Sequence, residues 1–291
     1  VYITFMNPLG LHLWYFDLIK YLLFLALPIL VKGKSELLSD IELQADINSS
    51  LNAIAQVQKA FGKYSIETPE IFSGNHRDFE HIKLVKDSEL GSAFAFYIHR
   101  DEDGDRDKKW PKGKERQRNE IKGYQSSPET LKAKISETHY IKWYLKIEKT
   151  FKITKAFCHF FQLKAVGSQN VEDPILTLSG VIERGKPQLQ LQWWSGDQSG
   201  RIFLADWEDC KDKWLICESI CNYAKDGSLK FSIRSADGVL NIEKVHKLET
   251  WRKGFSFVRP KWGIYRSIAD VKQNMNSEDQ ILLNNILVKK I

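Results

Sequence analysis

Three short segments of the sequence place cations, a carboxamide and a phenol at alternate positions. They are "RQRNEIK" at residues 116–122, "FCHFFQLKA" at 157–165 and "RPKWGIYRS" at 259–267. Side chains two residues apart on a strand point to the same face, so each segment would present its polar groups together if it were extended. Arginine and glutamine donate paired hydrogen bonds to a carboxylate, and lysine and tyrosine can exchange a proton. These residue types are therefore suited to proton transfer beside a bound carboxylate.

The first segment alternates charges along one face, which carries Arg116, Arg118, Glu120 and Lys122. A buried ionic face is costly unless its charges are paired. We therefore expect this face to lie toward water or a polar ligand, with Glu120 holding Arg118 in place. The alternative interpretation of Arg118 and Glu120 is an ion pair of the sheet with no further role.

The second segment carries polar candidates on one face. Gln162 and Lys164 share that face, whereas His159 alternates to the opposite one with Phe161 and Leu163. We therefore expect His159 to be a packed histidine unless the strand bulges. The alternative for Gln162 is a hydrogen bond within the sheet, because buried amides need partners.

The third segment places Lys261, Gly263 and Tyr265 on one face, with Arg266 next in the chain. Glycine has no side chain, so a sugar ring could approach closely between the lysine and the tyrosine. The alternative for Tyr265 is a core tyrosine whose hydroxyl reaches the rim of the site.

These groups match the needs of β-elimination in a uronic-acid polymer. A cation or strong donor must neutralise the carboxylate so that the proton on C5 becomes acidic. A base must remove that proton, and an acid must protonate the leaving glycosidic oxygen. Arginine and glutamine suit the first role, lysine or tyrosine the second, and tyrosine the third. The positive charges of Lys164 and Lys261 are expected to lower the pKa of Tyr265 by favouring the phenolate.

The same segments resemble three strand motifs of the jelly-roll polysaccharide lyases, the alginate, glucuronan and heparin lyase-like proteins of the concanavalin A-like superfamily. Those motifs are R-x-E-x-R, Q-x-H and K-x-G-x-Y, in this order. Here they read "RNEIK" (118–122), "QLK" (162–164) and "KWGIY" (261–265). The longer strings are similar to an uncharacterised secreted group of lyase-like proteins.

The resemblance implies a secreted lyase that cleaves an acidic, uronic-acid-containing polysaccharide. It implies catalytic roles for Arg118, Gln162, Lys164 and Tyr265, and substrate binding by Arg116, Glu120, Lys122, Lys261 and Arg266. Lys164 stands where those lyases have histidine, and Lys122 replaces their second arginine. Whether Lys164 or Tyr265 is the base therefore stays open.

The elements that must position these residues are mostly short strands. Runs rich in β-branched and aromatic residues recur between residues 81 and 288, separated by Gly, Asp, Asn, Ser and Pro. No long helical pattern lies between them, which predicts an all-β antiparallel jelly-roll sandwich in one domain over 65–291. Apolar residues at helical spacing predict a short helical N-terminal lead-in over 34–64.

The N-terminal residues 1–33 contain the uncharged apolar run "YLLFLALPILV". It has the length of a signal-peptide core and is short for a membrane span, which predicts a signal peptide or an N-terminal hydrophobic segment. We expect a secreted or periplasmic monomer with no membrane contact beyond this segment. Export would permit disulfides, and Cys210 with Cys217 or Cys221 is the expected pair.

No metal ligand is expected among the site residues, and no cofactor is expected. The cysteines lack the spacing of a zinc site. Asp101, Asp103 and Asp105 alternate in a highly charged stretch, which suggests a structural Ca²⁺, although the stretch does not match an EF-hand loop. The alternative is a solvated loop.

Composition and motifs also bear on which other classes of function this sequence could have. The net charge of +6 favours an acidic partner, but basic and acidic residues are interleaved and no nucleic-acid-binding motif is present, so nucleic acid is not expected. A glycoside hydrolase needs two carboxyls at a set separation, and Glu120 would need Asp206, Glu208 or Glu243 as its partner. The other alternative is a non-catalytic carbohydrate-binding module.

Overall fold

The structure is a computed structural model that describes residues 39–72, 75–105, 115–269 and 275–291. The hydrophobic segment 1–33 lies outside the described residues. The described residues belong by their contacts to one unit, Leu38–Ile291. In this part of the chain, no helix has both the length and the apolar character needed to cross a membrane.

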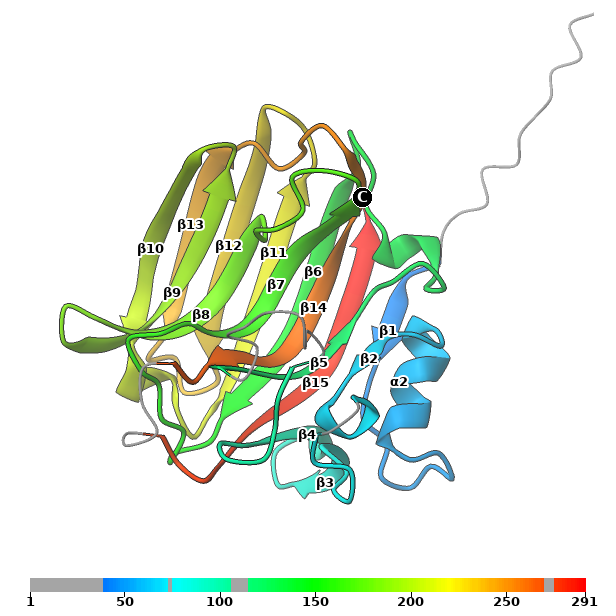
Figure 1. The fold of residues 1–291 in the computed structure, drawn as a ribbon, viewed down its shortest axis with the longest axis vertical. Coiled ribbons are helices and arrows are strands. Elements are labelled where there is room, and N and C mark those ends of the chain that lie inside the picture. The colour runs from blue at the N-terminus through cyan, green and yellow to red at the C-terminus, as the bar shows by residue number, and fades with distance from the viewer. Residues whose placement is uncertain (1–38, 73–74, 106–114, 270–274) are drawn as a thin grey trace, which may run out of the picture. The chain divides into compact units, whose positions relative to one another are not determined.

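Two antiparallel sheets stack into a sandwich, and Figure 1 shows them as two layers. Sheet A contains, in spatial order, β13 (Asn241–Leu248), β12 (Gly227–Ser235), β11 (Trp214–Asn222), β6 (Thr138–Ile147), β15 (Glu278–Lys290), β4 (Gly91–His99) and β3 (Ile82–Asp87), and β1 (Ile41–Leu43) also pairs with β15. Sheet B contains β10 (Gln198–Asp206), β9 (Lys186–Ser195), β8 (Leu176–Glu183), β7 (Cys158–Gly167), β14 (Phe255–Ser267), β5 (Arg116–Lys122) and β2 (Ile66–Glu67). The prediction of an all-β antiparallel jelly-roll sandwich is confirmed.

The core lies between the two sheets and is rich in aromatic side chains. Burial alternates along β6 and β12, as expected for strands with one face toward the other sheet. Trp143 of β6 stacks on Phe161 of β7, with ring centroids 4.2 Å apart, and Trp262 of β14 lies 5.7 Å from Phe161. These contacts join the central strands of both sheets, and they hold β7 and β14 side by side.

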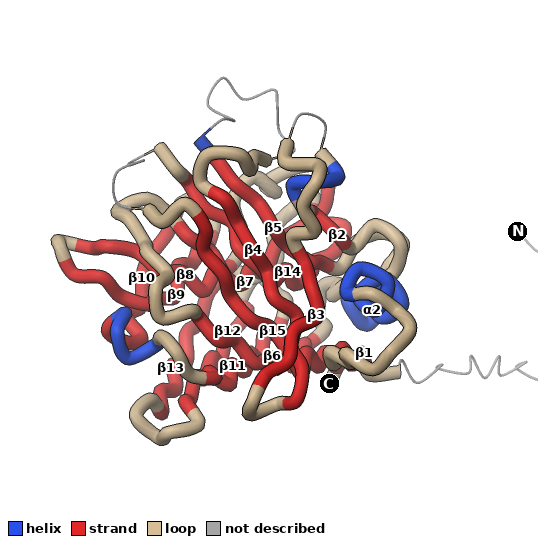
Figure 2. Tube along the Cα trace, turned by 90° about the horizontal axis from the view of Figure 1, so that it is seen from below, coloured by secondary structure: helices blue, strands red, loops and turns tan. Residues whose placement is uncertain are grey.

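The N-terminal lead-in is less helical than the sequence predicts. Among its described residues, 39–64, Ile41–Leu43 forms strand β1 and only Ala53–Phe61 forms an α-helix, α2. The Asn52 side chain caps the first turn, and Gly62 follows the last turn with a φ of +94°. Figure 2 shows α2 at one side of the sandwich, near β1. Its last residue, Phe61, is fully buried in the core.

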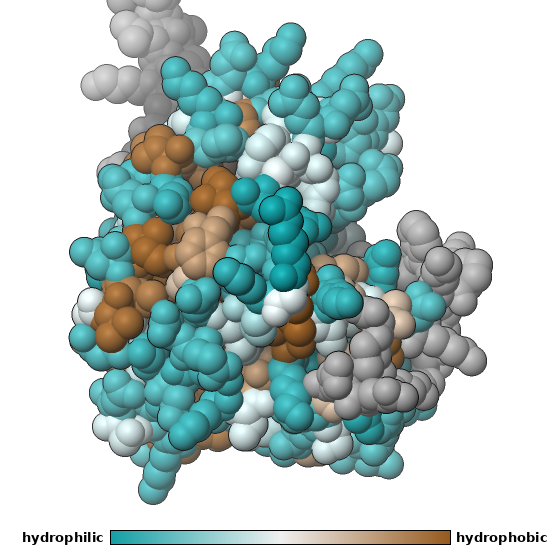
Figure 3. Space-filling view, turned by 90° about the vertical axis from the view of Figure 1, so that its left-hand side faces the viewer, coloured by the Kyte–Doolittle hydropathy of each residue, from teal (hydrophilic) through white to brown (hydrophobic). Residues whose placement is uncertain are grey.

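The strand β10 was not predicted from the sequence, because it is an edge strand with little regular burial. The opposite sheet ends in another exposed strand, β13. Figure 3 views the side of the molecule where these strands lie, and the surface there is mostly hydrophilic with separate hydrophobic patches. Charged side chains such as Arg201 and Lys244 protect such edges from pairing with other chains.

The expected disulfide does not form. All four cysteines, Cys158, Cys210, Cys217 and Cys221, are free and buried. Burial raises the pKa of the Cys210 thiol to about 12, so it stays protonated. The four thiols therefore contribute to the core as small apolar side chains.

Candidate active site on sheet B

Three neighbouring strands of sheet B bring most of the expected residues together. β14 lies between β5 and β7, with Tyr265 opposite Arg118 on one side and Lys261 opposite Gln162 on the other. Lys261 is also opposite Lys122. Because paired residues in adjacent strands share a face, these side chains form one continuous polar surface.

Arg118 lies at the centre of a buried ionic network. Its guanidinium donates to Asp105 at 2.8 and 3.1 Å and to Glu120 at 2.6 Å. Glu120 also accepts hydrogen bonds from Gln162 and Lys261, each at 2.5 Å. Burial disfavours the guanidinium, yet Glu120 and its neighbouring carboxylates raise the pKa of Arg118 well above its ordinary value. The expected contact between Glu120 and Arg118 is present, but it is one bond of a larger network.

We expected this ionic face to lie toward water or a polar ligand, and most of it is buried from water. Arg118 and Lys122 are each only 5% exposed, and Glu120 is 1% exposed. Strand β2 supplies Glu67, whose carboxylate lies 2.5 Å from the amine of Lys122 and 2.8 Å from that of Lys261. Pairing with carboxylates is what permits these charges to leave water.

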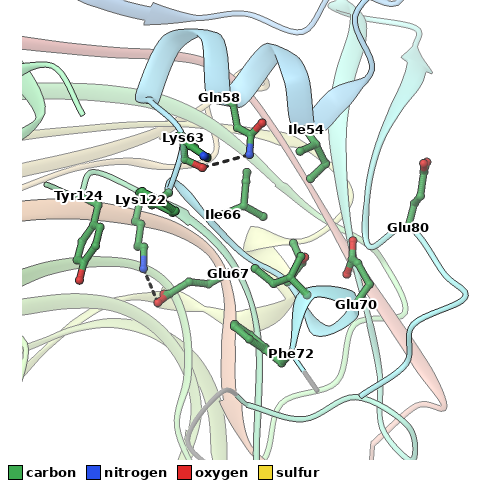
Figure 4. A pocket seen from close by; sticks show the side chains of 13 residues that line it. Ile54, Gln58, Lys63, Ile66, Glu67, Glu70, Phe72, Glu80, Lys122 and Tyr124 are labelled. Carbon is green, nitrogen blue, oxygen red and sulfur yellow. Dashed lines mark hydrogen bonds and ion pairs between the residues drawn. The ribbon is translucent and has the colours of Figure 1, made fainter. Parts of the chain in front are cut away.

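A pocket of about 490 Å³ adjoins this network beside α2 and β2. In Figure 4 the amine of Lys122 points to the carboxylate of Glu67, and Tyr124 lies beside Lys122. Burial lowers the pKa of Lys122 to about 8, although Glu67 opposes this shift. The pocket touches the network at this edge, and Tyr265 is not among its lining residues.

Tyr265 stands on the same face and keeps partial access to solvent. Its ring centroid lies 3.7 Å from the guanidinium carbon of Arg118, and its hydroxyl accepts a hydrogen bond from Arg116 at 3.0 Å. Burial raises the pKa of Tyr265, and this effect outweighs the opposing effect of the two arginines. The expected lowering of this pKa by Lys164 and Lys261 is therefore wrong, and the phenol is protonated at neutral pH.

His159 lies on this polar face, because β7 contains a bulge. The register of β7 shifts between His159 and Phe161 against β8, and His159 is paired with Tyr265 of β14. The ring centroids of His159 and Tyr265 are 6.0 Å apart, and His159 Nδ1 lies 2.8 Å from Ser179 Oγ. Burial, reinforced by nearby cations, lowers the pKa of His159 to about 3, so its imidazole is neutral.

The sequence contains one signal for this bulge. Phe160 and Phe161 are consecutive and both fully buried, which breaks the simple alternation of a strand. The expectation that His159 packs on the face opposite Gln162 is corrected by this extra residue.

Lys164 lies on the same face as Gln162, opposite Arg259 of β14. Its amine donates a hydrogen bond to the backbone carbonyl of Glu172. Burial lowers the pKa of Lys164 to about 7, and the positive charge of Lys261 adds to this shift. A substantial fraction of the amine is therefore neutral near pH 7.

Two expectations for the third segment are corrected. Arg266 follows Tyr265 directly, so it points to the opposite face, where it is 1% exposed and bonds Asp279 at 2.5 Å and Gln117 at 2.9 Å. It therefore cannot contact a ligand on the polar face. Gly263 does not leave room for a sugar ring, because a Cβ atom there would lie 2.1 Å from the backbone oxygen of Asn119. The missing side chain accommodates the neighbouring strand β5.

The three alternating aspartates have three different partners. Asp101 pairs with Arg100, Asp103 with His81, and Asp105 with Arg118. The suggested structural Ca²⁺ stays a prediction. Asp105 and Glu67 are the site residues that the sequence motifs did not indicate.

The stacked sheets have the architecture of the jelly-roll polysaccharide lyases. No model of a known protein family matches the chain, and no curated protein matches it. Among solved structures, the alginate lyase Aly36B matches with a TM-score of 0.56 and 10% identity, over 88% of this chain and 98% of that one.

Two further alginate lyases match in the same way. The enzyme from Klebsiella pneumoniae has a TM-score of 0.53 and 9% identity, over 78% of this chain and 95% of that one. The PL7 enzyme AlyA1 from Zobellia galactanivorans has a TM-score of 0.51 and 13% identity, over 86% and 95%. At these identities the match shows the fold alone, and at that level the resemblance to jelly-roll polysaccharide lyases is confirmed.

Proposed function

We propose that this protein is a polysaccharide lyase that cleaves a uronic-acid-containing polysaccharide by β-elimination. The observation that carries the proposal is the environment of Tyr265. Its protonated hydroxyl bonds Arg116 at 3.0 Å, and it shares one face of sheet B with Gln162 and Lys164. A proton donor, a cation and a basic amine therefore lie on one face of sheet B, with Lys164 opposite Arg259 and Tyr265 opposite His159. The solved structures of the same fold include alginate lyases.

The reaction needs one proton to leave the sugar and one to arrive. The base takes the proton from C5, the electron pair forms the double bond between C4 and C5, and the bond from C4 to the glycosidic oxygen breaks. The acid then protonates that oxygen. Tyr265 suits the acid role, because its raised pKa keeps the phenol protonated. The same shift argues against Tyr265 as the base.

Lys164 is the base that we propose. An efficient general base has a pKa near the working pH, and the Lys164 amine has a pKa of about 7. Burial and the nearby cations lower the pKa of His159 to about 3, so its neutral imidazole is a weak base. We assign His159 to positioning Tyr265 and the sugar ring.

Neutralisation of the substrate carboxylate cannot depend on Arg118 alone, since Asp105 and Glu120 already bind its guanidinium. Arg116 lies farther along the same strand, half-buried, and bonds the Tyr265 hydroxyl. We propose that Arg116 binds the substrate carboxylate and that the guanidinium of Arg118 supports the ring of Tyr265 by stacking on it.

Export of the protein through segment 1–33 stays a prediction.

Because Asp105 and Glu120 already bind the Arg118 guanidinium, one alternative gains support, namely a carbohydrate-binding module without catalysis. A module needs the polar face but no proton transfer. The hydrolase alternative lacks such support, because Glu208 and Glu243 pair with Lys211 and Lys230 at the surface.

One assay separates these functions. The purified chain is incubated with alginate, glucuronan and heparin, and absorbance of the unsaturated uronate is followed together with new reducing ends. A lyase produces both signals, and a hydrolase produces reducing ends alone. Binding of a polymer with neither signal would contradict the lyase proposal and support the module.

A further inference from the structure

Three of the seven histidines of the sequence converge at the end of sheet A, around one aspartate. His81 directly precedes β3, His99 ends β4, Asp103 lies in the loop after β4, and His76 lies in the loop before β3. We call these four residues the histidine cluster. Their nearest ligand atoms all lie within 4.8 Å of one another.

Several separations between these atoms are close to those of a tetrahedral metal site. With metal–ligand bonds of about 2.0–2.1 Å, the four ligands of a tetrahedral zinc ion lie about 3.3 Å apart. The observed separations are 3.3 Å for His81 Nε2 to His99 Nδ1, 3.2 Å for His99 Nδ1 to Asp103 Oδ2, 3.3 Å for His76 Nδ1 to Asp103 Oδ1 and 2.9 Å for His81 Nε2 to Asp103 Oδ1. These four separations involve both oxygens of Asp103 and lie near the tetrahedral value, and one ligand atom from each residue lies within 4.8 Å of the others, so the side chains would have to draw together around an ion.

The second nitrogen of every imidazole in the cluster faces a carboxylate. The pairs are His81 Nδ1 with Glu70 Oε2 at 2.8 Å, His99 Nε2 with Glu278 Oε2 at 2.8 Å, and His76 Nε2 with Glu102 Oε2 at 3.2 Å. Metal-binding histidines almost always donate their other ring N–H to such a partner, which fixes the tautomer and the ring orientation. Three carboxylates thus turn the remaining nitrogens toward one point.

The surroundings of the cluster favour a bound ion rather than a solvated charge group. The side chains of His81 and Asp103 are fully buried, and Phe79 packs against the imidazoles with centroid distances of 4.6 to 5.4 Å. Within the described residues, the buried His76 Nδ1 has no hydrogen-bond partner. A buried nitrogen directed at a carboxylate without a hydrogen bond is suited to coordinate a metal.

We propose that His76, His81, His99 and Asp103 bind a divalent transition-metal ion, and that zinc is the ion that fits best. Three imidazoles and one carboxylate are ligands that zinc accepts, whereas calcium requires six to eight oxygen ligands. Four protein ligands fill a tetrahedral site and leave no open position, so the ion has a structural role.

This site connects to the candidate active site through the backbone. Gln117 Nε2 donates to the Asp103 carbonyl at 2.9 Å, and Arg118 N donates to the Gly104 carbonyl at 3.1 Å. Asp105, the next residue, binds the Arg118 guanidinium. An ion held by Asp103 would therefore fix the loop that delivers Asp105 to Arg118.

The test uses the full chain stripped of metal with a chelator and then titrated with Co²⁺, which reports a tetrahedral site by its visible d–d absorption. We expect about one ion per chain, displacement of the cobalt spectrum by Zn²⁺, and a melting temperature that rises by several degrees with Zn²⁺. If the stripped chain unfolds, recovery of its near-ultraviolet circular dichroism with Zn²⁺ supports the proposal as well.

Variants separate specific binding from adventitious binding. His76→Ala, which removes the most exposed of the three imidazoles, should abolish the tetrahedral cobalt spectrum. Glu278→Gln should weaken affinity about 10- to 100-fold, as loss of a carboxylate behind a ligand does. His246→Ala on β13 is the matched control and should bind like the wild type. A folded wild type that takes up no Co²⁺, or a His76→Ala chain that binds as well as the wild type, would overturn the proposal.

Discussion

The phenol ring of Tyr265 lies on the guanidinium of Arg118, 3.7 Å from centroid to carbon, where β14 and β5 pair. Arg118 cannot follow a movement of the ring, because Asp105 and Glu120 hold it from two sides. The stacked pair gains cation–π attraction, which is strengthened because the guanidinium of Arg118 is buried. Tyr265 is therefore oriented by buried ion pairs, and this rigidity suits the proton-donor role that we propose for it.

Replacing the hydroxyl tests the role of this tyrosine. Tyr265→Phe keeps the ring on Arg118 and removes only the group that bonds Arg116. We expect turnover to fall at least about 100-fold, since general acids typically contribute 100- to 10,000-fold, while polymer binding and melting temperature change little. Tyr140→Phe on sheet A, which removes a half-buried phenol bonded to Glu218, is the control and should retain activity. Wild-type turnover by Tyr265→Phe would contradict the assignment.

The dependence of activity on pH tests the base. Lys164 accepts a proton only when neutral, so kcat/KM should rise as the pH increases through about 7, the pKa of its amine. Tyr265 must stay protonated, and its raised pKa places the loss of activity above the ordinary tyrosine value of 10.0. Lys164→Ala should remove the lower limb and reduce turnover at least about 100-fold.

The competing base is tested by a matched variant. His159→Asn can keep a hydrogen bond to Ser179 and should leave the limb near pH 7 in place, because His159 has a pKa of about 3. If His159→Asn abolishes turnover while Lys164→Ala keeps both rate and pH profile, then His159 is the base.

The buried ionic network should be sensitive to loss of one carboxylate. Glu67 contacts the amines of Lys122 and Lys261, so Glu67→Gln leaves buried positive charge without its partner. We expect the free energy of unfolding to fall by about 3–5 kcal/mol, measured by denaturant titration. Glu243→Gln removes an exposed ion pair with Lys230 and should cost about 1 kcal/mol or less. Equal effects of both substitutions would show that the buried network is not needed for stability.

Gly263 tests whether the glycine of the third segment is structural. It has a φ of +135°, and a Cβ atom would lie 2.1 Å from the Asn119 oxygen. Gly263→Ala should therefore destabilise the protein by at least about 3 kcal/mol, from backbone strain and overlap together. Gly185→Ala shares a positive φ of +82° but meets nothing within 4 Å, so it should cost only about 1–2 kcal/mol. A smaller loss of melting temperature for Gly263→Ala than for Gly185→Ala would contradict this explanation.

The sequence by itself determined the β class, most of the strands and one face of the candidate site. Alternation is a local property, so "RQRNEIK" predicts the strand β5 with its observed bounds, and Lys261 and Tyr265 share a face as expected. The edge strand β10 escaped prediction because exposure on both faces removes the alternation on which such predictions depend.

Only the tertiary structure decided which charges are paired and which histidines are functional candidates. Glu67 reaches Lys122 and Lys261 from a strand of two residues, and His99 meets Glu278 across 179 positions of sequence. Such partners depend on the order of strands in a sheet, which local patterns do not encode. The bulge that turns His159 toward Tyr265 has the same origin, because one extra residue reverses every later side chain and its position depends on packing between sheets.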